Sequence, residues 1–144
     1  DGMARDIRAI RAMRFPVFHG GIAPLDSKGR GKVAEIDTPI RCGGVAVPCH
    51  PGRPRVGLFD HFEAKGVVAG VSVIETLNGG SRGEEDARAL ALAQAHGYRG
   101  IGGSDAHIVS QIARCVTRFP REIRDGEGLV ESLRAGDFEA VSWK

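Results

Sequence analysis

Residues 71–107 read VSVIETLNGGSRGEEDARALALAQAHGYRGIGGSDAH, in which two apolar runs flank a helical pattern. The first run is rich in Val and Ile and predicts a buried strand within residues 67–77, beginning near Val71. Residues 83–96 predict a helix, because its first turn is acidic and a glycine follows its last turn. A second short strand is expected at 99–102. This strand–helix–strand order is typical of two parallel strands joined by a crossover helix.

The same alternation extends to both sides of this stretch. Further helices are expected at 4–14, 57–65 and 126–135, further strands at 15–18, 43–49, 114–119 and 138–142, and an edge hairpin at 32–36. One strand–helix repeat takes about 30 residues, whereas a full eight-fold barrel takes roughly 250. The 144 residues therefore predict one α/β domain over 1–144, with four or five repeats and a mainly parallel sheet.

Composition and charge exclude several classes of protein. Lys and Arg total 20 against 18 Asp and Glu, and these residues are interspersed, so no basic stripe indicates nucleic-acid binding. The longest apolar runs fall far short of the roughly 18 residues that span a membrane. Three cysteines in a chain of this length are not a disulfide framework, and a reducing, cytoplasmic location is expected. Because the chain opens at Asp1 within a helical pattern, we expect it to be a piece of a longer protein.

Two candidate metal ligands follow the strand expected at 99–102. Side chains two positions apart in extended chain point the same way, so Asp105 and His107 are expected to converge beyond its carboxyl end. His50 ends the apolar run 43–49, and the carboxyl ends of parallel strands lie at one edge of a sheet. A carboxylate and two imidazoles suit zinc. The alternatives are a turn at Asp105, an exposed His107 and a loop His50 bonded to backbone.

Two further residues are candidates for substrate binding. Asn78 ends the first strand at the same edge, where it could contact substrate or orient a ligand, although Asn-Gly turn chemistry explains it equally well. Arg53 lies three residues after His50, and its guanidinium would suit a phosphate oxyanion. The alternative for Arg53 is an ordinary solvated loop arginine.

Other residues and motifs receive no functional role. His61 and His96 lie in expected helices, the evidence for His19 is thin, and Cys42, Cys49 and Cys115 form no C-x-x-C pair. The sequence contains no P-loop, no G-x-G-x-x-G opening a helix and no G-x-S-x-G elbow.

The order GGVAVPCHPGR, VIETLNG, ARALALAQAHG and GIGGSDAH resembles the C-terminal part of the PHP (polymerase and histidinol phosphatase) family. The resemblance covers about residues 40–141, and LVESLRAGDF near its end is similar to PHP-associated tails. It implies part of a distorted (β/α)7 barrel. It also implies a centre of two or three zinc, manganese or iron ions that hydrolyses phosphate esters.

The resemblance also implies roles for individual residues. His50, Asp105 and His107 match metal ligands, whereas Glu75 and Ser104 would support them. The family's H-x-H and a G-x-E glutamate are absent from these 144 residues. We expect a metal-dependent phosphoesterase acting on a small phosphorylated substrate. The alternatives are a non-catalytic module with a degenerate metal site and a related hydrolase of C–N bonds. A barrel without its opening strands is expected to self-associate or to pair with a missing N-terminal segment.

Overall fold

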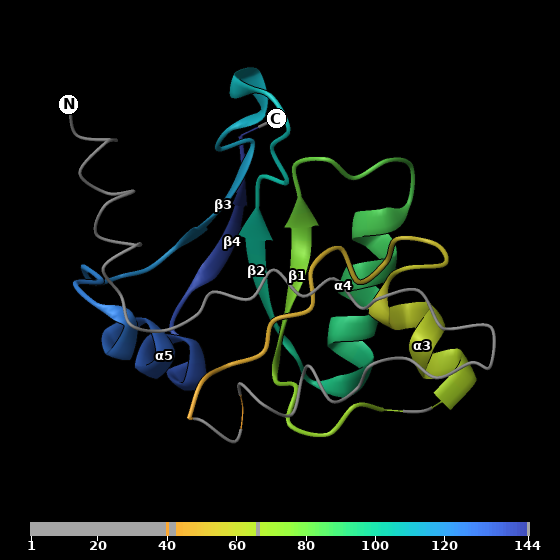
Figure 1. Ribbon diagram of the computed structural model, residues 1–144, viewed down its shortest axis with the longest axis horizontal. Helices are drawn as coiled ribbons and strands as arrows, with labels where there is room; N and C mark the ends of the chain where they lie inside the picture. Colours follow the sequence, from red (N-terminus) through yellow and green to blue (C-terminus); the bar gives the residue numbers. More distant parts are fainter. Residues whose placement is uncertain (1–39, 41–42, 66, 144) are drawn as a thin grey trace.

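The computed structural model describes residue 40 and residues 43–65 and 67–143 (Figure 1). Its elements in chain order are α3 (Leu58–Lys65), β1 (Val73–Asn78), α4 (Glu85–His96), β2 (Arg99–Gly103), a 3-10 turn η1 (Val109–Gln111), β3 (Cys115–Arg118), α5 (Gly126–Ala135) and β4 (Glu139–Ser142). The strands are short, with four to six residues each.

The strands form two small sheets that lie next to each other. β1 and β2 pair in parallel with Val73 opposite Arg99, whereas β3 and β4 pair antiparallel with Cys115 opposite Ser142. Figure 1 shows all four strands side by side, and β2 contacts both β3 and β4. The Thr117 hydroxyl joins the sheets, because it donates to the Gly102 carbonyl at 2.9 Å and accepts from the Gly102 N–H at 3.1 Å.

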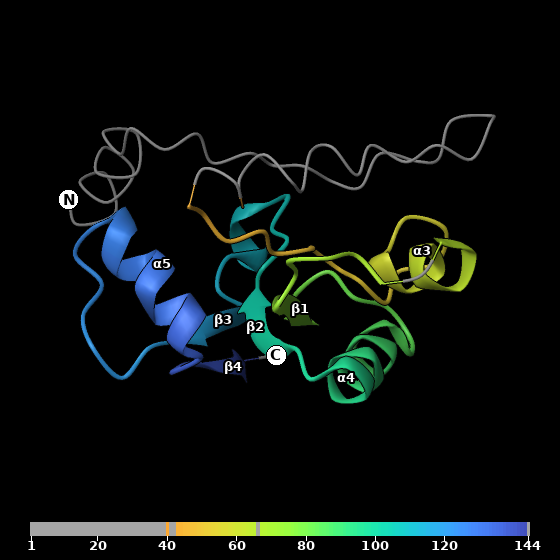
Figure 2. The ribbon, with the colours of Figure 1, turned by 90° about the horizontal axis from the view of Figure 1, so that it is seen from below.

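The core lies between β1 and the helices α3 and α4. Figure 2 shows both helices to one side of the strands, with α5 on the other side. Helix α4 contacts β1 directly, and every residue of β1 except Leu77 is buried. One apolar cluster fills the space, made of Leu58, Val68, Val71, Ile74, Leu92 and Ala93.

Capping residues fix the ends of the two longest helices. Helix α4 ends at Gly97, whose φ of 69° is left-handed and whose N–H reaches the Ala93 carbonyl. Glycine adopts this conformation without the steric strain of a side chain. Helix α5 begins at Asp125, whose carboxylate accepts from the Gly128 N–H at 2.8 Å, and it ends at the left-handed Gly136. These caps explain why sequence patterns located both helices well.

Several expected elements are confirmed. The helices expected at 57–65, 83–96 and 126–135 are α3, α4 and α5, and the strands expected at 99–102, 114–119 and 138–142 are β2, β3 and β4. The buried strand expected within 67–77 is β1, which begins at Val73. The expected elements at 4–14, 15–18 and 32–36 lie outside the described residues.

Two fold predictions are wrong. Residues 44–48 are irregular rather than a strand, and the Pro48 carbonyl accepts from the Glu75 N–H of β1 at 3.1 Å. The predicted partial (β/α)7 barrel with a mainly parallel sheet is absent from the described part of the chain, where each sheet has two strands. The physical reason is that the chain reverses through α5, so β4 returns antiparallel to β3.

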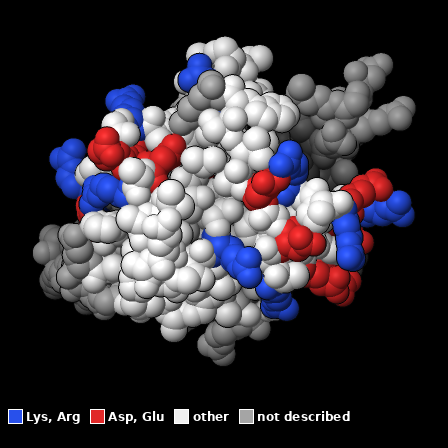
Figure 3. Space-filling model, turned by 180° about the vertical axis from the view of Figure 1, so that it is seen from behind, with Lys and Arg blue, Asp and Glu red and all other residues white. Residues whose placement is uncertain are grey.

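The surface carries charges of both signs. On the face shown in Figure 3, basic and acidic side chains lie next to one another between neutral areas. No described helix is long and apolar enough to cross a membrane.

Candidate functional site

Three loops meet at the carboxyl ends of β1 and β2. One follows β1, one follows β2, and the third comprises residues 48–57, which pack against both. These loops bring together the edge cluster, defined here as His50, Arg53, Glu75, Asn78 and Asp105. The sequence predicted this location, because carboxyl ends of parallel strands share one edge.

Glu75 is the buried centre of the edge cluster. Glu75 is only 7% exposed, and its Oε2 accepts from the His50 N–H at 2.6 Å and from Asn78 Nδ2 at 2.9 Å. Asn78 is 2% exposed, and its Oδ1 in turn accepts from the Gly80 N–H at 2.7 Å. A buried carboxylate needs such donors to offset the loss of water. Glu75 therefore ties the loop at His50 to the end of β1.

Arg53 connects the edge cluster to helix α4. Its Nη2 donates to Asp105 Oδ2 at 2.9 Å, and its Nε donates to Glu85 Oε2 at 3.4 Å. The side chain of Arg53 is 28% exposed, that of Asp105 24% and that of Glu85 16%. This ion-pair network therefore borders solvent. The guanidinium is positioned where a ligand from solution can reach it.

The backbone at the edge cluster is strained. His50 and Asp105 have φ angles of 35° and 45°, in the left-handed region that side chains disfavour. Such conformations cost on the order of 1–3 kcal/mol each and concentrate at functional sites. Neighbouring glycines make room for the two carboxylates. A Cβ at Gly80 would lie 2.8 Å from Asp105 Oδ2, and one at Gly103 would overlap Glu75 Oε1.

The charges around Asp105 favour its ionised form. Burial works against ionisation, but the hydrogen bond and charge of Arg53, followed by His50 and His107, hold the pKa of Asp105 below its usual value. For Arg53, burial again opposes the charge, yet Asp105 and Glu85 raise its pKa. Burial, with the charges of Glu75 and Asp105, raises the pKa of the Cys49 thiol, which therefore remains protonated near neutral pH.

The two imidazoles differ in their bonding. His50 Nδ1 is buried and has no hydrogen-bond partner among the described residues. His107 is exposed, and its Nδ1 lies 2.8 Å from the Asp105 backbone carbonyl. Because a carbonyl oxygen can only accept, His107 Nδ1 carries a hydrogen, and in the neutral form of the ring Nε2 presents a lone pair.

The predicted metal ligands are close in space but do not form a metal site. His50 and His107 lie near enough to Asp105 for their charges to act on it. Within the described ranges, however, no three His, Cys, Asp or Glu side chains are grouped to hold a metal ion. Arg53 already occupies Asp105 Oδ2. Ser104 precedes Asp105, and its carbonyl lies against Gly79.

Sequence reasoning missed two acidic residues in the first turn of α4. Glu85 accepts from Arg53, and Asp86 Oδ1 accepts from the Ser81 hydroxyl at 2.6 Å and from the Asn78 N–H at 3.1 Å. The sequence pattern indicates for both only an acidic first turn of a helix. The signal that could have located them is the short spacing between Asn78 and α4, which returns that first turn to the same edge.

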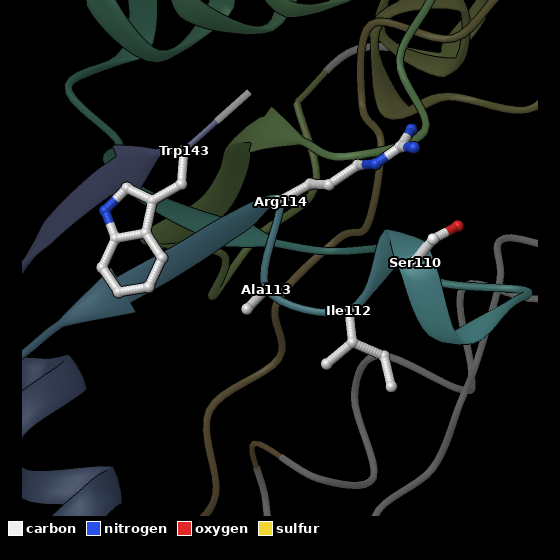
Figure 4. A pocket seen from close by; sticks show the side chains of 5 residues that line it. All are labelled: Ser110, Ile112, Ala113, Arg114 and Trp143. Carbon is white, nitrogen blue, oxygen red and sulfur yellow. The ribbon is translucent and has the colours of Figure 1, made fainter.

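A separate open pocket of about 560 Å³ lies beside β3. It is lined by Ser110, Ile112, Ala113, Arg114 and Trp143, and Figure 4 shows the Arg114 guanidinium extending away from the Trp143 indole. Its polar groups do not converge, so the edge cluster is the stronger candidate site.

Comparisons with known proteins divide the chain into two parts. Residues 1–53 match the family model described as Aldolase/RraA, and residues 83–138 match the model described as PHP-associated. A putative 4-hydroxy-4-methyl-2-oxoglutarate aldolase from Halalkalibacterium halodurans is 47% identical over 60 residues. These residues are 42% of this chain and 27% of that relative. No solved structure matches the chain.

These findings support one part of the predicted resemblance and correct another. Residues 83–138 are similar to PHP-associated segments, as expected for the tail of the chain. The predicted phosphoesterase function is wrong, because the first part of the chain is similar to aldolases and not to phosphate ester hydrolases. The edge cluster gives a physical reason, since phosphoester hydrolysis of the expected kind needs grouped metal ligands and Arg53 occupies Asp105 instead.

Proposed function

We propose that the chain serves an aldolase-type lyase reaction, the cleavage of a carbon–carbon bond in a hydroxylated 2-oxo acid. The similarity to the putative aldolase, 47% identity over 60 residues, carries this proposal. The Aldolase/RraA match ends at Arg53, so it includes His50 and Arg53 of the edge cluster. The proposal therefore connects the matched stretch with the described site.

The chemistry of aldol cleavage sets three requirements. A base takes the proton of the hydroxyl group, whose oxygen becomes a carbonyl as the adjacent carbon–carbon bond breaks. The electron pair of that bond passes to the 2-oxo fragment as an enolate, which is then protonated on carbon. A positive group must stabilise the enolate oxygen, and another must hold the substrate carboxylate.

The edge cluster and the neighbouring His107 offer groups for two of these requirements, the group that holds the substrate carboxylate and the base. Arg53 is a planar guanidinium that can bind a carboxylate through two parallel hydrogen bonds, and it borders solvent. The Nε2 lone pair of His107 is available to accept a proton, because Nδ1 is bonded to the Asp105 carbonyl. Asn78 holds the loop between β1 and α4 in place through Gly80.

RraA-like aldolases can use divalent cations such as Mg²⁺. The sequence-based candidates for holding one are His50, Asp105 and His107. In the described arrangement these residues do not fit a bound cation, since no ligand group of three is formed and Asp105 is paired with Arg53. We therefore assign no reaction step to a metal ion.

Pyruvate release from 4-hydroxy-4-methyl-2-oxoglutarate tests the proposal. Aldol cleavage of this compound yields two molecules of pyruvate, which a coupled assay detects. Arg53→Gln is expected to lower kcat/KM by about 10²-fold, since it removes a charged partner of the reacting groups. Arg124→Gln is the matched control, because Arg124 is 81% exposed and pairs with Glu122 rather than with a residue of the edge cluster. No pyruvate release by the unaltered chain, with and without Mg²⁺, would contradict the proposal.

A further inference from the structure

The loop that carries Arg53 lies directly on the first turn of helix α4. A Cβ at Gly52 would overlap the Glu85 carbonyl oxygen and would lie 3.0 Å from the Ala89 backbone nitrogen. Glycine permits this close approach because it has no Cβ. Arg53 follows Gly52 directly in the chain, so the distance between the loop and the helix determines where the Arg53 guanidinium lies.

Arg88 binds the same loop from the next turn of α4. Its Nη1 donates to the Gly52 carbonyl at 3.2 Å, and its Nη2 donates to Asp60 Oδ1 of helix α3 at 3.0 Å. Its guanidinium carbon also lies 4.4 Å from the centre of the Phe59 ring, a favourable arrangement of a cation over an aromatic face. Because the guanidinium is planar and donates in fixed directions, Arg88 fixes the Gly52 carbonyl relative to both helices.

Hydrogen bonds within the loop connect Gly52 to the backbone of Arg53. The Arg53 N–H donates to the His50 carbonyl at 3.0 Å, and the Arg53 carbonyl accepts from the Gly57 N–H at 2.8 Å. Gly52 and Gly57 are both buried, so the loop is closely packed on each side of Arg53. A change in the position of the Gly52 carbonyl would therefore also move the Arg53 backbone.

The ion pairs of Arg53 with Asp105 and Glu85 do not secure its position once a ligand binds. Both pairs border solvent, where ion pairs contribute little, and a substrate carboxylate competes for the same donors. The hydrogen bond of Arg88 to the Gly52 carbonyl uses no atom of the Arg53 side chain. This hydrogen bond therefore persists when Arg53 turns from Asp105 to the ligand.

We propose that Arg88 is a positioning residue for Arg53, because it holds the Gly52 carbonyl and so keeps the Arg53 guanidinium where a substrate carboxylate can reach it. Arg88 acts through the backbone of the loop and does not touch the substrate. Orienting a charged group before the substrate arrives lowers the cost of binding. The effect on substrate binding rests on the proposed function, whereas the fixing of the loop does not.

Hydrogen exchange of backbone amides in the full chain, followed by nuclear magnetic resonance, tests the fixing of the loop. Arg88→Met keeps an aliphatic side chain but removes the donors. The amides of Arg53 and Gly57 are expected to exchange at least about fivefold faster, the effect of losing one ordinary hydrogen bond. The Arg99 amide, which donates to the Ser72 carbonyl at the start of β2, should exchange as before. Equal acceleration at all three amides, or none at any, would overturn the proposal.

Steady-state kinetics with 4-hydroxy-4-methyl-2-oxoglutarate test the effect on substrate binding. Arg88→Met is expected to raise KM at least about fivefold and to change kcat less, because a carboxylate contact is made in both the ground state and the transition state. Arg88→Lys keeps the positive charge over Phe59 and one donor group, so it should recover part of the KM. Circular dichroism confirms that each variant is folded. An unchanged KM in Arg88→Met would overturn the positioning role.

Arg134→Met is the matched control. Arg134 Nη2 also donates to a loop carbonyl, that of Gly43 at 2.7 Å, but from helix α5. Figure 2 shows α5 on the other side of the strands from α4. Arg134→Met should therefore leave both KM and the exchange of the Arg53 and Gly57 amides unchanged. The same increase in KM in this variant would mean that loss of any such contact disturbs the site, and the specific role of Arg88 would be refuted.

Failure of the proposed function and failure of this inference give different results. A chain that releases no pyruvate, yet shows faster exchange only at Arg53 and Gly57 in Arg88→Met, would refute the aldolase function and leave Arg88 as the residue that fixes the loop. A chain that cleaves the substrate with the same KM in Arg88→Met as in the unaltered form would refute the positioning role alone.

Discussion

The two sheets differ in how their residues are held. The sheet of β1 and β2, with α3, α4 and the segment just before β1, contains eight of the nine hydrophobic residues that make up the described core, and the ninth is Cys115 in β3. The sheet of β3 and β4 is flanked by α5, none of whose residues is buried. Its cross-strand ion pair, Arg118 with Glu139, is more than half exposed. The first sheet is stabilised by burial and the second by pairing at the surface.

This difference explains where the candidate site lies. Strained backbone at His50 and Asp105 persists only where surrounding contacts stabilise it. The buried side of β1 provides such contacts through Glu75 and Asn78. The second sheet has no comparable group of buried polar residues within the described ranges. Rigid support, rather than the number of polar residues, therefore distinguishes the two regions.

Truncation of one apolar side chain in each sheet should give the largest difference in the free energy of unfolding. Ile74 is fully buried in β1, whereas Val141 in β4 is only partly buried. Ile74→Ala is expected to lower the free energy of unfolding by about 2–5 kcal/mol, because it leaves a cavity. Val141→Ala should lower it by about 1 kcal/mol or less. Urea unfolding followed by circular dichroism measures both, and equal losses would contradict the proposed difference in burial.

Two glycine substitutions separate steric from conformational effects. A Cβ at Gly103 would overlap Glu75 Oε1, whereas one at Gly97 meets nothing within 4 Å but requires a φ of 69°. Gly103→Ala is expected to cost about 1–3 kcal/mol, because the carboxylate held by two donors must move. Gly97→Ala should cost about 1 kcal/mol from backbone strain alone.

The two variants should also differ at the edge cluster. Amide chemical shifts report the hydrogen bond from the His50 N–H to Glu75. Gly103→Ala should perturb the His50 amide, and Gly97→Ala should leave it unchanged. An unperturbed His50 amide in Gly103→Ala would indicate that Glu75 is not held as described.

Local patterns predicted the helices and most of the strands. The left-handed glycines at 97 and 136 and the cap at Asp125 act within one or two turns, so they can be interpreted from neighbouring residues. The direction of β4 could not be predicted in this way. It depends on pairing between residues distant in the sequence, since β4 lies antiparallel to β3 with Cys115 opposite Ser142.

Sequence patterns predicted only part of the edge cluster, because the rest also depends on contacts between distant residues. The rule that parallel strands share a carboxyl edge placed Asn78 and Asp105 together, while the pairing of Arg53 with Asp105 depends on the path of an irregular loop. The types and positions of His50, Asp105 and His107 indicate a metal centre, whereas the pairing of Asp105 with Arg53 appears only in the folded chain. Residues 1–53, which match the Aldolase/RraA model, contain no P-loop, no G-x-G-x-x-G opening a helix and no G-x-S-x-G elbow.

The smallest expected difference is in how far ionised Asp105 and ionised Glu122 stabilise the fold as the pH falls. Arg53 holds the pKa of Asp105 below its usual value, so ionised Asp105 stabilises the fold above about pH 4, the ordinary pKa of an aspartate. This stabilisation is lost as the pH falls through the lowered pKa, where Asp105 becomes protonated in the folded state. Glu122 pairs with Arg124 but is 73% exposed, where ion pairs contribute little.

Urea unfolding between pH 7 and pH 2.5 measures this difference for Asp105→Asn and Glu122→Gln. The stability gap between the unaltered chain and Asp105→Asn should be widest above about pH 4 and should narrow below it, and salt should reduce it because the pair borders solvent. Glu122→Gln should follow the unaltered chain at every pH. A gap for Asp105→Asn that does not narrow in acid would mean that the residue acts through its shape and not its charge. In that case the ion pair with Arg53 would not stabilise the left-handed backbone conformation of Asp105. Arg53 could then bind a ligand without a loss of stability from breaking its contact with Asp105.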